Sequence, residues 1–311
     1  MDSSCTIANK DLSAVKVEER VSLFVREITV LDYAYLDPSR GVLGGSLDID
    51  VEFIGGLDEE GVVFDFSLAK KAVKKVIDDL CDHRLVCPRS SIKEDVEGRV
   101  KLEWNYGAGF SIKYDCPSEA VCVLETAQVD TESMMSYLEK ETMKVMPKNV
   151  EKLVLHAREE NLFGAPEYRY THGLKQHYGN CQRLLHGHRN RVDVEINGEK
   201  SSKWEETCAK NWNDIHLAFP ENCPDQDLKM GARQDHLQSV YVVYTSIQGK
   251  FEAWLPGSSV YIMPYETTVE NISRHLCETV AQEASKQETI DSVKVWAYEG
   301  IRKGSLSSYP S

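Results

Sequence analysis

The sequence predicts an α+β protein made of antiparallel sheets with helices packed on one face of each sheet. Three observations lead to this prediction. Several short segments alternate apolar and polar residues, which is typical of strands with one buried face. Longer segments, such as residues 67–80, place their apolar side chains on one stripe at helical spacing. Finally, similar segments recur in the same order along the chain, so the unit of sheet and helices is expected to occur twice.

The first half of the chain begins with a predicted hairpin. Residues 21–30 and 43–53 alternate apolar and polar side chains, and a turn that contains Pro38 and three glycines separates them. The acidic residues of the second strand are expected to face water. Ser67 is expected to cap the helix 67–80. The remaining elements of this half are predicted as strands at 99–104, 109–114 and 150–156 and a helix at 131–146 that Pro147 stops.

The second half shows similar elements in a similar order. Strands are predicted at 191–196, 240–246, 250–255 and 293–298, and a helix is predicted at 269–284. The last helix and the last strand resemble the helix and the strand that close the first half.

Two pairs of segments support a duplication. Residues 151–160 resemble residues 291–300, and both runs lead into a glutamate. Residues 43–54 resemble residues 185–196. The offset along the chain is nearly the same in the two pairs. Because two independent features repeat at nearly the same offset, a tandem duplication is predicted.

The duplication divides the chain into a first module at residues 21–163 and a second at residues 164–305. The segment 200–238, with Trp204 and Trp212, does not reproduce the corresponding part of the first module. Two roles are left as alternatives for this segment, a lid and an assembly contact.

Composition limits the classes of partner. The 311 residues carry a formal net charge of −14, which argues against non-specific binding to nucleic acid or to an anionic membrane. No segment approaches the roughly 20 apolar residues of a membrane helix. Nine cysteines are spread along the chain without a dense disulfide pattern. These observations predict a soluble, cytoplasmic protein, and an anionic small substrate remains possible.

A group of histidines predicts a metal site in the second module. His186 and His188 flank Gly187 at the start of a strand, where residues two apart point to the same face. His172 is expected on the preceding strand of the same hairpin. Three protein ligands leave one zinc position open for water or substrate, as in catalytic sites. The sequence therefore predicts one Zn²⁺ held by these three histidines.

Cys181 precedes this histidine pair by five residues. A nearby Zn²⁺ favours a thiolate, which makes Cys181 a candidate base or nucleophile. Alternatively, Cys181 is the fourth zinc ligand, and the site is then closed and structural. Both interpretations are open at this point.

Asp82 and His83 follow one another where the first helix ends. An adjacent carboxylate can orient and charge a histidine. A helix C-terminus also favours a cation through its dipole, without any catalytic role. The residues alone favour this second interpretation.

Four segments resemble the 6-pyruvoyltetrahydropterin and 6-carboxytetrahydropterin synthases. The run CQRLLHGHRNRVDVEINGE resembles the zinc segment of that family, and GVVFDFSLAKKAVKKVIDDLCDHRL resembles its helix and Asp-His segment. Thr268 and Glu270 fall in a T-x-E-N segment of the same kind. Glu299 falls where the family has its pterin-anchoring glutamate.

The resemblance implies a tunnelling fold (T-fold), whose antiparallel sheets assemble into a barrel with helices outside, and a homo-oligomer. It implies the substrate 7,8-dihydroneopterin triphosphate, which Glu299, Glu270 and Thr268 are expected to bind. It also implies the catalytic triad Cys181, Asp82 and His83 beside the zinc. In the family, the cysteine and the Asp-His pair come from neighbouring subunits.

Each module holds only half of these motifs. The first module has the Asp-His pair, but Gly44, Gly45 and Ser46 stand where the zinc histidines are expected. We therefore hypothesise that the two modules jointly build one kind of active site. In the second module, Asp214 and His216 are separated by one residue, so the role of the Asp-His pair is not carried over to them.

The expected function is that of a lyase of the 6-carboxytetrahydropterin synthase type, in the pathway to queuosine and other 7-deazaguanines. A 6-pyruvoyltetrahydropterin synthase, in the tetrahydrobiopterin pathway, and a pterin-binding module without catalysis are the alternatives. The candidates for holding the triphosphate are Arg183, Arg189, Arg191 and Lys175.

Overall fold

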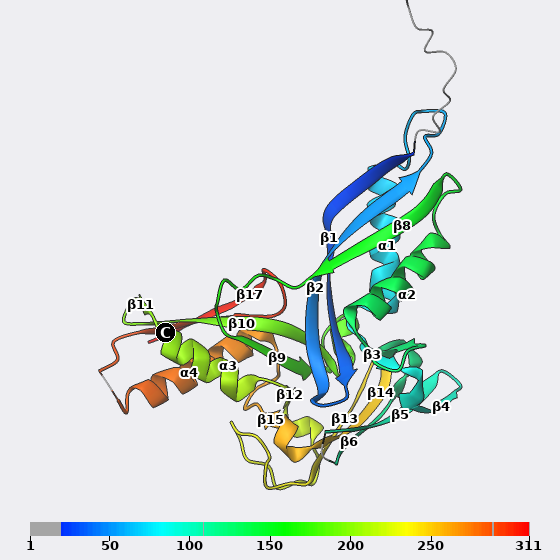
Figure 1. Ribbon diagram of the computed structural model, residues 1–311. Coiled ribbons are helices and arrows are strands. Elements are labelled where there is room, and N and C mark those ends of the chain that lie inside the picture. The colour runs from blue at the N-terminus through cyan, green and yellow to red at the C-terminus, as the bar shows by residue number, and fades with distance from the viewer. Residues whose placement is uncertain (1–19, 108, 288, 311) are drawn as a thin grey trace, which may run out of the picture.

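The computed structural model describes residues 20–107, 109–287 and 289–310 (Figure 1). It confirms a mixed α+β architecture of sheets and few helices. The sheets are not purely antiparallel, because β3 pairs parallel with β1 and β7, and β12 pairs parallel with β9 and β15. The polar segment 1–19 lies outside the described residues. Within the described part of the chain, no helix is long and apolar enough to cross a membrane.

The first sheet belongs to the N-terminal half of the chain. Its strand order is β7-β3-β1-β2-β8. The strands are β1 (Val21–Asp37), β2 (Gly41–Gly55), β3 (Leu85–Pro88), β7 (Val121–Leu124) and β8 (Val150–Arg158). Two helices, α1 (Phe66–Leu80) and α2 (Thr131–Met143), pack on this sheet and share one apolar core with it.

The second sheet repeats this order in the C-terminal half. Its strands follow one another as β15-β12-β9-β10-β16, and β17 is added at the edge. The strands are β9 (Glu167–His172), β10 (His186–Ile196), β12 (Ile215–Ala218), β15 (Val260–Ile262), β16 (Val293–Tyr298) and β17 (Gly304–Tyr309), and the short β11 (Glu199–Lys200) pairs with β10. Helices α3 (Ser202–Trp212) and α4 (Val269–Ala284) share the core of this sheet. Each strand and helix of the first unit thus has a counterpart here.

A third sheet joins the two halves. The hairpins β5 (Arg99–Tyr106) with β6 (Phe110–Pro117) and β13 (Ser239–Ser246) with β14 (Gly249–Pro256) meet edge to edge, because β14 pairs with β6. The order is β13-β14-β6-β5-β4, with β4 (Ile92–Val96) at one edge. Short 3₁₀ turns lie at Arg89–Ser91, Ser118–Ala120, Asn180–Gln182, Pro220–Asn222 and Gly257–Ser259. One apolar core contains residues from both halves.

Part of the segment 200–238 belongs to the repeated unit itself. It supplies α3 and β12, the counterparts of α1 and β3. Trp204 and Trp212 are 5% and 3% exposed and belong to the core of the second unit. The sequence pattern missed this helix because few of its residues are apolar and the tryptophans and Cys208 form only a narrow stripe.

Three local predictions for the first unit were wrong. Gly44 and Gly45 belong to β2 and not to the turn. The N-cap of α1 is Asp65, whose side chain accepts hydrogen bonds from two backbone N–H groups of the first turn. Asp48 and Asp50 do not face water: both are buried, and arginines neutralise them.

The two hairpins β1–β2 and β9–β10 pack against each other at a pair of glycines. A Cβ on Gly44 would overlap the backbone of His188 and the carbonyl of Tyr170. A Cβ on Gly187 would lie 2.9 Å from the Cα of Gly44. Only glycine permits so close an approach of two backbones. This contact brings the motifs of the two halves together.

The strand pairing also corrects the alignment of the two halves. Val51 pairs with Leu155, and Val194 pairs with Val295. Since Leu155 and Val295 are counterparts in the repeat, Val51 is the counterpart of Val194 and not of the residue before it. The sequence alignment of β2 with β10 was therefore wrong by one position. Consequently the counterparts of the zinc-segment residues 186–188 are Leu43, Gly44 and Gly45.

Candidate metal centre and active site

Three histidines from β9 and β10 converge on one point. His186 is the cross-strand partner of His172, and His188 lies two residues further along the same strand. One ring nitrogen of each lies within 4.8 Å of the others. The Nε2 atoms of His172 and His188 are 3.3 Å apart. Two nitrogens bound to one tetrahedral Zn²⁺ at 2.0–2.1 Å would be about 3.4 Å apart.

The other nitrogen of each ring faces an acceptor. Nδ1 of His172 donates to the Thr267 carbonyl at 2.9 Å, and Nδ1 of His186 donates to the Arg183 carbonyl at 2.7 Å. Because a carbonyl only accepts, both rings carry their proton on Nδ1 and present a lone pair at Nε2. Nδ1 of His188 lies 3.2 Å from the Asp32 carboxylate, which is within ion-pair distance but lacks the alignment of a hydrogen bond. The negative charge of the carboxylate supports a proton on this nitrogen.

The protonation of these rings also suits a metal. Burial, followed by the neighbouring imidazoles, lowers the pKa of His172 and of His186 well below the ordinary value. Both rings are therefore neutral at physiological pH. Nε2 of His186 is buried and has no hydrogen-bond partner. Three buried imidazoles with convergent nitrogens, two of them neutral, fit the donor set of Zn²⁺.

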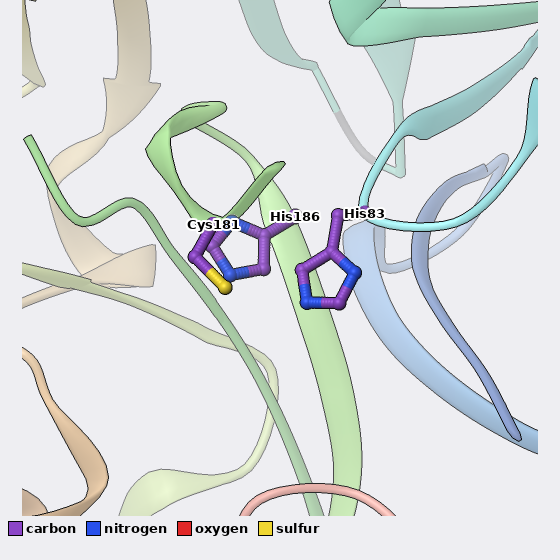
Figure 2. Close-up of side chains that lie close together, drawn as sticks. All are labelled: His83, Cys181 and His186. Atoms are coloured by element: carbon purple, nitrogen blue, oxygen red, sulfur yellow. The ribbon is translucent and has the colours of Figure 1, made fainter. Parts of the chain in front are cut away.

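A second group meets the first at His186. Donor atoms of His83, Cys181 and His186 lie within 4.8 Å of one another (Figure 2). The rings of His83 and His186 have their centroids 5.0 Å apart. His83 comes from the first half, after α1, and Cys181 from the 3₁₀ turn before β10. One chain therefore supplies residues from both halves to one site.

Cys181 does not join the group of three histidines. Its sulfur lies within 4.8 Å of ring nitrogens of His83 and His186. The sulfur and the ring nitrogens of His172, His186 and His188 do not all lie within 4.8 Å of one another. This arrangement argues against Cys181 as a fourth ligand of a tetrahedral site.

His83 is held by its neighbour and by the backbone. Its Nδ1 lies 2.6 Å from Oδ2 of Asp82. Burial would lower the pKa of His83, but hydrogen bonds with Asp82 and Cys181 raise it to about 10. The backbone of His83 has φ +54°, a left-handed conformation that is uncommon for histidine.

Glu299 borders the histidine group. Its Oε1 lies 3.8 Å from Nε2 of His172 and 3.9 Å from Nε2 of His188. The other two residues expected to bind substrate lie differently. Thr268 is the N-cap of α4, and Glu270 is exposed on the first turn of that helix. The residue of this segment that contacts the site is Thr267, through its carbonyl.

Three of the expected phosphate-binding cations are engaged within the chain. Arg183 is buried and donates to the Asp82 carbonyl at 3.1 Å. Arg189 contacts Glu167, and Arg191 donates to a tyrosine hydroxyl. Sequence reasoning overlooked Asp32 and Lys303, which lie 2.9 Å apart beside the histidines. No local pattern marks either residue.

The repeat relates the candidate site to a second position, which is built from different residues. Tyr35 is the counterpart of His172, and Asp214 is the counterpart of His83, by strand pairing and by their shared positive φ. Asp214 accepts a hydrogen bond from Nε of Arg40 at 2.7 Å. Glu159, the counterpart of Glu299, pairs with Arg169 at 2.7 Å. Among the described residues, both groups that could hold a metal lie at the other position.

His216 does not reproduce the role of His83 in this corresponding position. It is buried, and its Nδ1 lies 3.0 Å from the Thr171 hydroxyl. Burial lowers its pKa to about 3, so the ring stays neutral.

Comparisons with known proteins find similarity to one family. Two solved structures of 6-pyruvoyltetrahydropterin synthase are similar to the chain, one from Plasmodium falciparum and one from Plasmodium vivax. Their sequence identities are 18% and 16%, and each alignment covers 45% of this chain and 98% of the other, with a TM-score of 0.34. No curated protein matches the chain. The family described as 6-pyruvoyl tetrahydropterin synthase matches residues 164–304. Residues 164–304 are therefore similar to the 6-pyruvoyl tetrahydropterin synthase family.

Proposed function

We propose that the protein is a zinc-dependent lyase of the 6-carboxytetrahydropterin synthase type, acting on 7,8-dihydroneopterin triphosphate in the pathway to queuosine and related 7-deazaguanines. One observation carries the proposal: the group His172, His186 and His188 shares His186 with the group that contains His83 and Cys181. A metal site and an acid-base pair thus adjoin. The family of residues 164–304 supports a tetrahydropterin synthase-like reaction.

The residues of the chain would divide the chemistry among them. Zn²⁺ held by the three histidines would supply Lewis acidity to the oxygens of the substrate side chain. The Cys181 thiolate would take or return a proton on the adjacent carbon. His83, oriented by Asp82, would act as the partner acid or base. His83 would release its proton more readily with a divalent cation bound nearby, because like charge disfavours the imidazolium form.

Binding of the pterin ring is assigned to Glu299. A carboxylate accepts from adjacent ring and amino N–H groups in a bidentate manner. Thr268 and Glu270 are proposed as further substrate contacts on the resemblance alone. Because Glu270 is exposed in the described chain, its contact would require a rearrangement of the first turn of α4.

Assembly into a homo-oligomer belongs to the same proposal. Strands β8 and β17 are edges of their sheets, and open edges are suited to pair with another chain. The cysteines of the described residues are free thiols, which supports a reducing, cytoplasmic location.

A 6-pyruvoyltetrahydropterin synthase is the second candidate. The description of the matched family favours it. Both reactions use the same zinc, cysteine and Asp-His pair, so the residues do not separate them. Product analysis does: release of acetaldehyde supports the 6-carboxytetrahydropterin synthase, and triphosphate release with a pyruvoyl product supports the alternative.

Metal analysis combined with turnover tests the proposal. Purified wild-type protein and His186→Ala are assayed for zinc and for conversion of dihydroneopterin triphosphate, and His156→Ala, an exposed histidine of β8, is the matched control. About one zinc per chain is expected for the wild type and the control. Both zinc and product are expected to be lost in His186→Ala. Zinc without turnover would instead favour a pterin-binding module, and two zincs per chain would contradict the single site.

A further inference from the structure

Asp32 is a buried carboxylate of β1 that contacts the second half of the chain. Its side chain is 3% exposed. It lies 3.2 Å from Nδ1 of His188, accepts a hydrogen bond from the Ser46 hydroxyl at 2.6 Å, and pairs with Lys303 at 2.9 Å. A residue of the first half therefore touches a histidine of the metal group.

The backbone of the same residue holds the Asp-His pair. The N–H of Asp32 donates to Oδ1 of Asp82 at 3.2 Å, and its carbonyl accepts from the N–H of His83 at 2.7 Å. The second of these bonds stabilises the left-handed backbone conformation of His83. Asp32 is thus connected to both groups of the candidate site, by its side chain to one and by its backbone to the other.

The segment after Glu299 packs closely against the Asp32 carboxylate. A Cβ on Gly300 would overlap the Asp32 carboxylate, and Gly300 has φ +76°, which favours glycine. The same turn delivers Lys303. The Lys303 ammonium at 2.9 Å and the Ser46 hydroxyl at 2.6 Å both donate to this carboxylate, which acts as the acceptor.

We propose that Asp32 is a positioning residue. Its side chain sets the tautomer and orientation of His188, and its backbone holds the Asp82–His83 pair beside the metal group. The inference rests on the proposed function. Carboxylates behind metal-bound histidines increase ligand basicity, and their loss typically lowers metal affinity by about 10- to 100-fold. Here the carboxylate comes from the half that has no metal ligands, so metal affinity would depend on the packing of the two halves.

A second carboxylate provides a matched control. Asp48 of β2 is also buried, and it pairs with Arg302 of the same turn at 2.7 Å. It joins the same two halves, but its contacts are to Arg302 and not to the histidines. Asp48→Asn therefore reports what is lost when a buried ion pair between the halves is weakened. Asp32→Asn reports the additional loss at His188.

The test measures zinc affinity by competition with a chromophoric chelator in the full-length protein without substrate. Asp32→Asn is expected to weaken zinc binding by about 10- to 100-fold and Asp48→Asn by less than about 3-fold. Lys303→Met keeps the carboxylate but removes its cation, and a smaller loss of about 3- to 10-fold is expected. This variant, at a half-exposed side chain, decides the question if Asp32→Asn does not fold.

Tautomer and turnover are the second readout. Nitrogen NMR of the zinc-loaded protein is expected to show His188 protonated on Nδ1 in the wild type and a changed signal in the Asp32 variant. A fall in kcat larger than any change in KM is expected because Asp32→Asn alters the contact with His188, whereas the backbone bonds of residue 32 to Asp82 and His83 remain. Equal zinc affinity in folded Asp32→Asn and wild type, or equal losses in the Asp32 and Asp48 variants, would overturn the inference. Absence of zinc binding by the wild type would overturn the proposed function itself.

Discussion

Replacement of His83 by alanine separates the acid-base group from the metal group. His83 is outside the set of three histidines, so His83→Ala is expected to keep about one zinc per chain. Removal of a general acid or base typically lowers turnover by about 10²- to 10⁴-fold. His186→Ala, by contrast, is expected to lose both zinc and turnover because His186 belongs to both groups.

Mixing the two inactive variants tests whether one chain builds the site. The rings of His83 and His186 lie 5.0 Å apart within one chain, so each mutant chain spoils its own site. Unfolded His83→Ala and His186→Ala chains are mixed in equal amounts, refolded together and assayed with dihydroneopterin triphosphate. No recovery above the separate variants is expected.

Recovery is the result that would refute this reasoning. If the two histidines came from different chains, random assembly of equal amounts would restore about one quarter of the sites. Wild-type chains treated in the same way measure the refolding yield. Full activity of His83→Ala, with His186→Ala inactive, would contradict the hypothesis that both halves contribute to the site.

Three further outcomes are expected. Gly44→Ala should destabilise the protein by about 3 kcal/mol or more because its Cβ would meet backbone atoms. Gly56→Ala, with open space around it, should change the unfolding free energy little. An equal effect of both variants in chemical denaturation would contradict the glycine contact. Burial would raise the pKa of Asp50, but hydrogen bonds from a backbone N–H and two arginines hold it at about 2, so its stabilisation is present above pH 4 and is lost as the pH falls through 2. Denaturation of wild type and Asp50→Asn from pH 6 to pH 2 should show the difference between them shrinking, and a constant difference would disagree. Glu299→Gln should raise the KM for the pterin or abolish turnover, while Glu159→Gln should leave both unchanged because that carboxylate pairs with an arginine; equal losses would mean that both glutamates serve a site.

Local periodicity was sufficient for many elements. The predicted helix 269–284 and strand 293–298 coincide with α4 and β16. An amphipathic stripe or an alternating segment records which face is buried, and that information lies within a few consecutive residues. Helix α3 was not predicted because its apolar stripe is weak and its burial depends on a few large side chains.

The candidate site divides in the same way. A strand periodicity of two residues was enough to place His186 and His188 on one face, and the hairpin brought His172 opposite them. The resemblance assigned a joint catalytic role to Cys181 and the Asp-His pair, and this role stays a prediction. The sequence by itself therefore determined the α+β class, the repeated order of elements and the set of residues expected at the metal.

Only the tertiary structure decided that one chain joins these residues. The close approach of Gly44 and Gly187 brings the two hairpins together and places His83 beside His186. The same packing delivers Asp32 to His188, although the two residues belong to different halves of the chain. Periodic patterns describe what each segment buries, but not which distant segment covers it. The partner of a buried carboxylate is therefore chosen by packing between the halves, and no local pattern in the sequence encodes it.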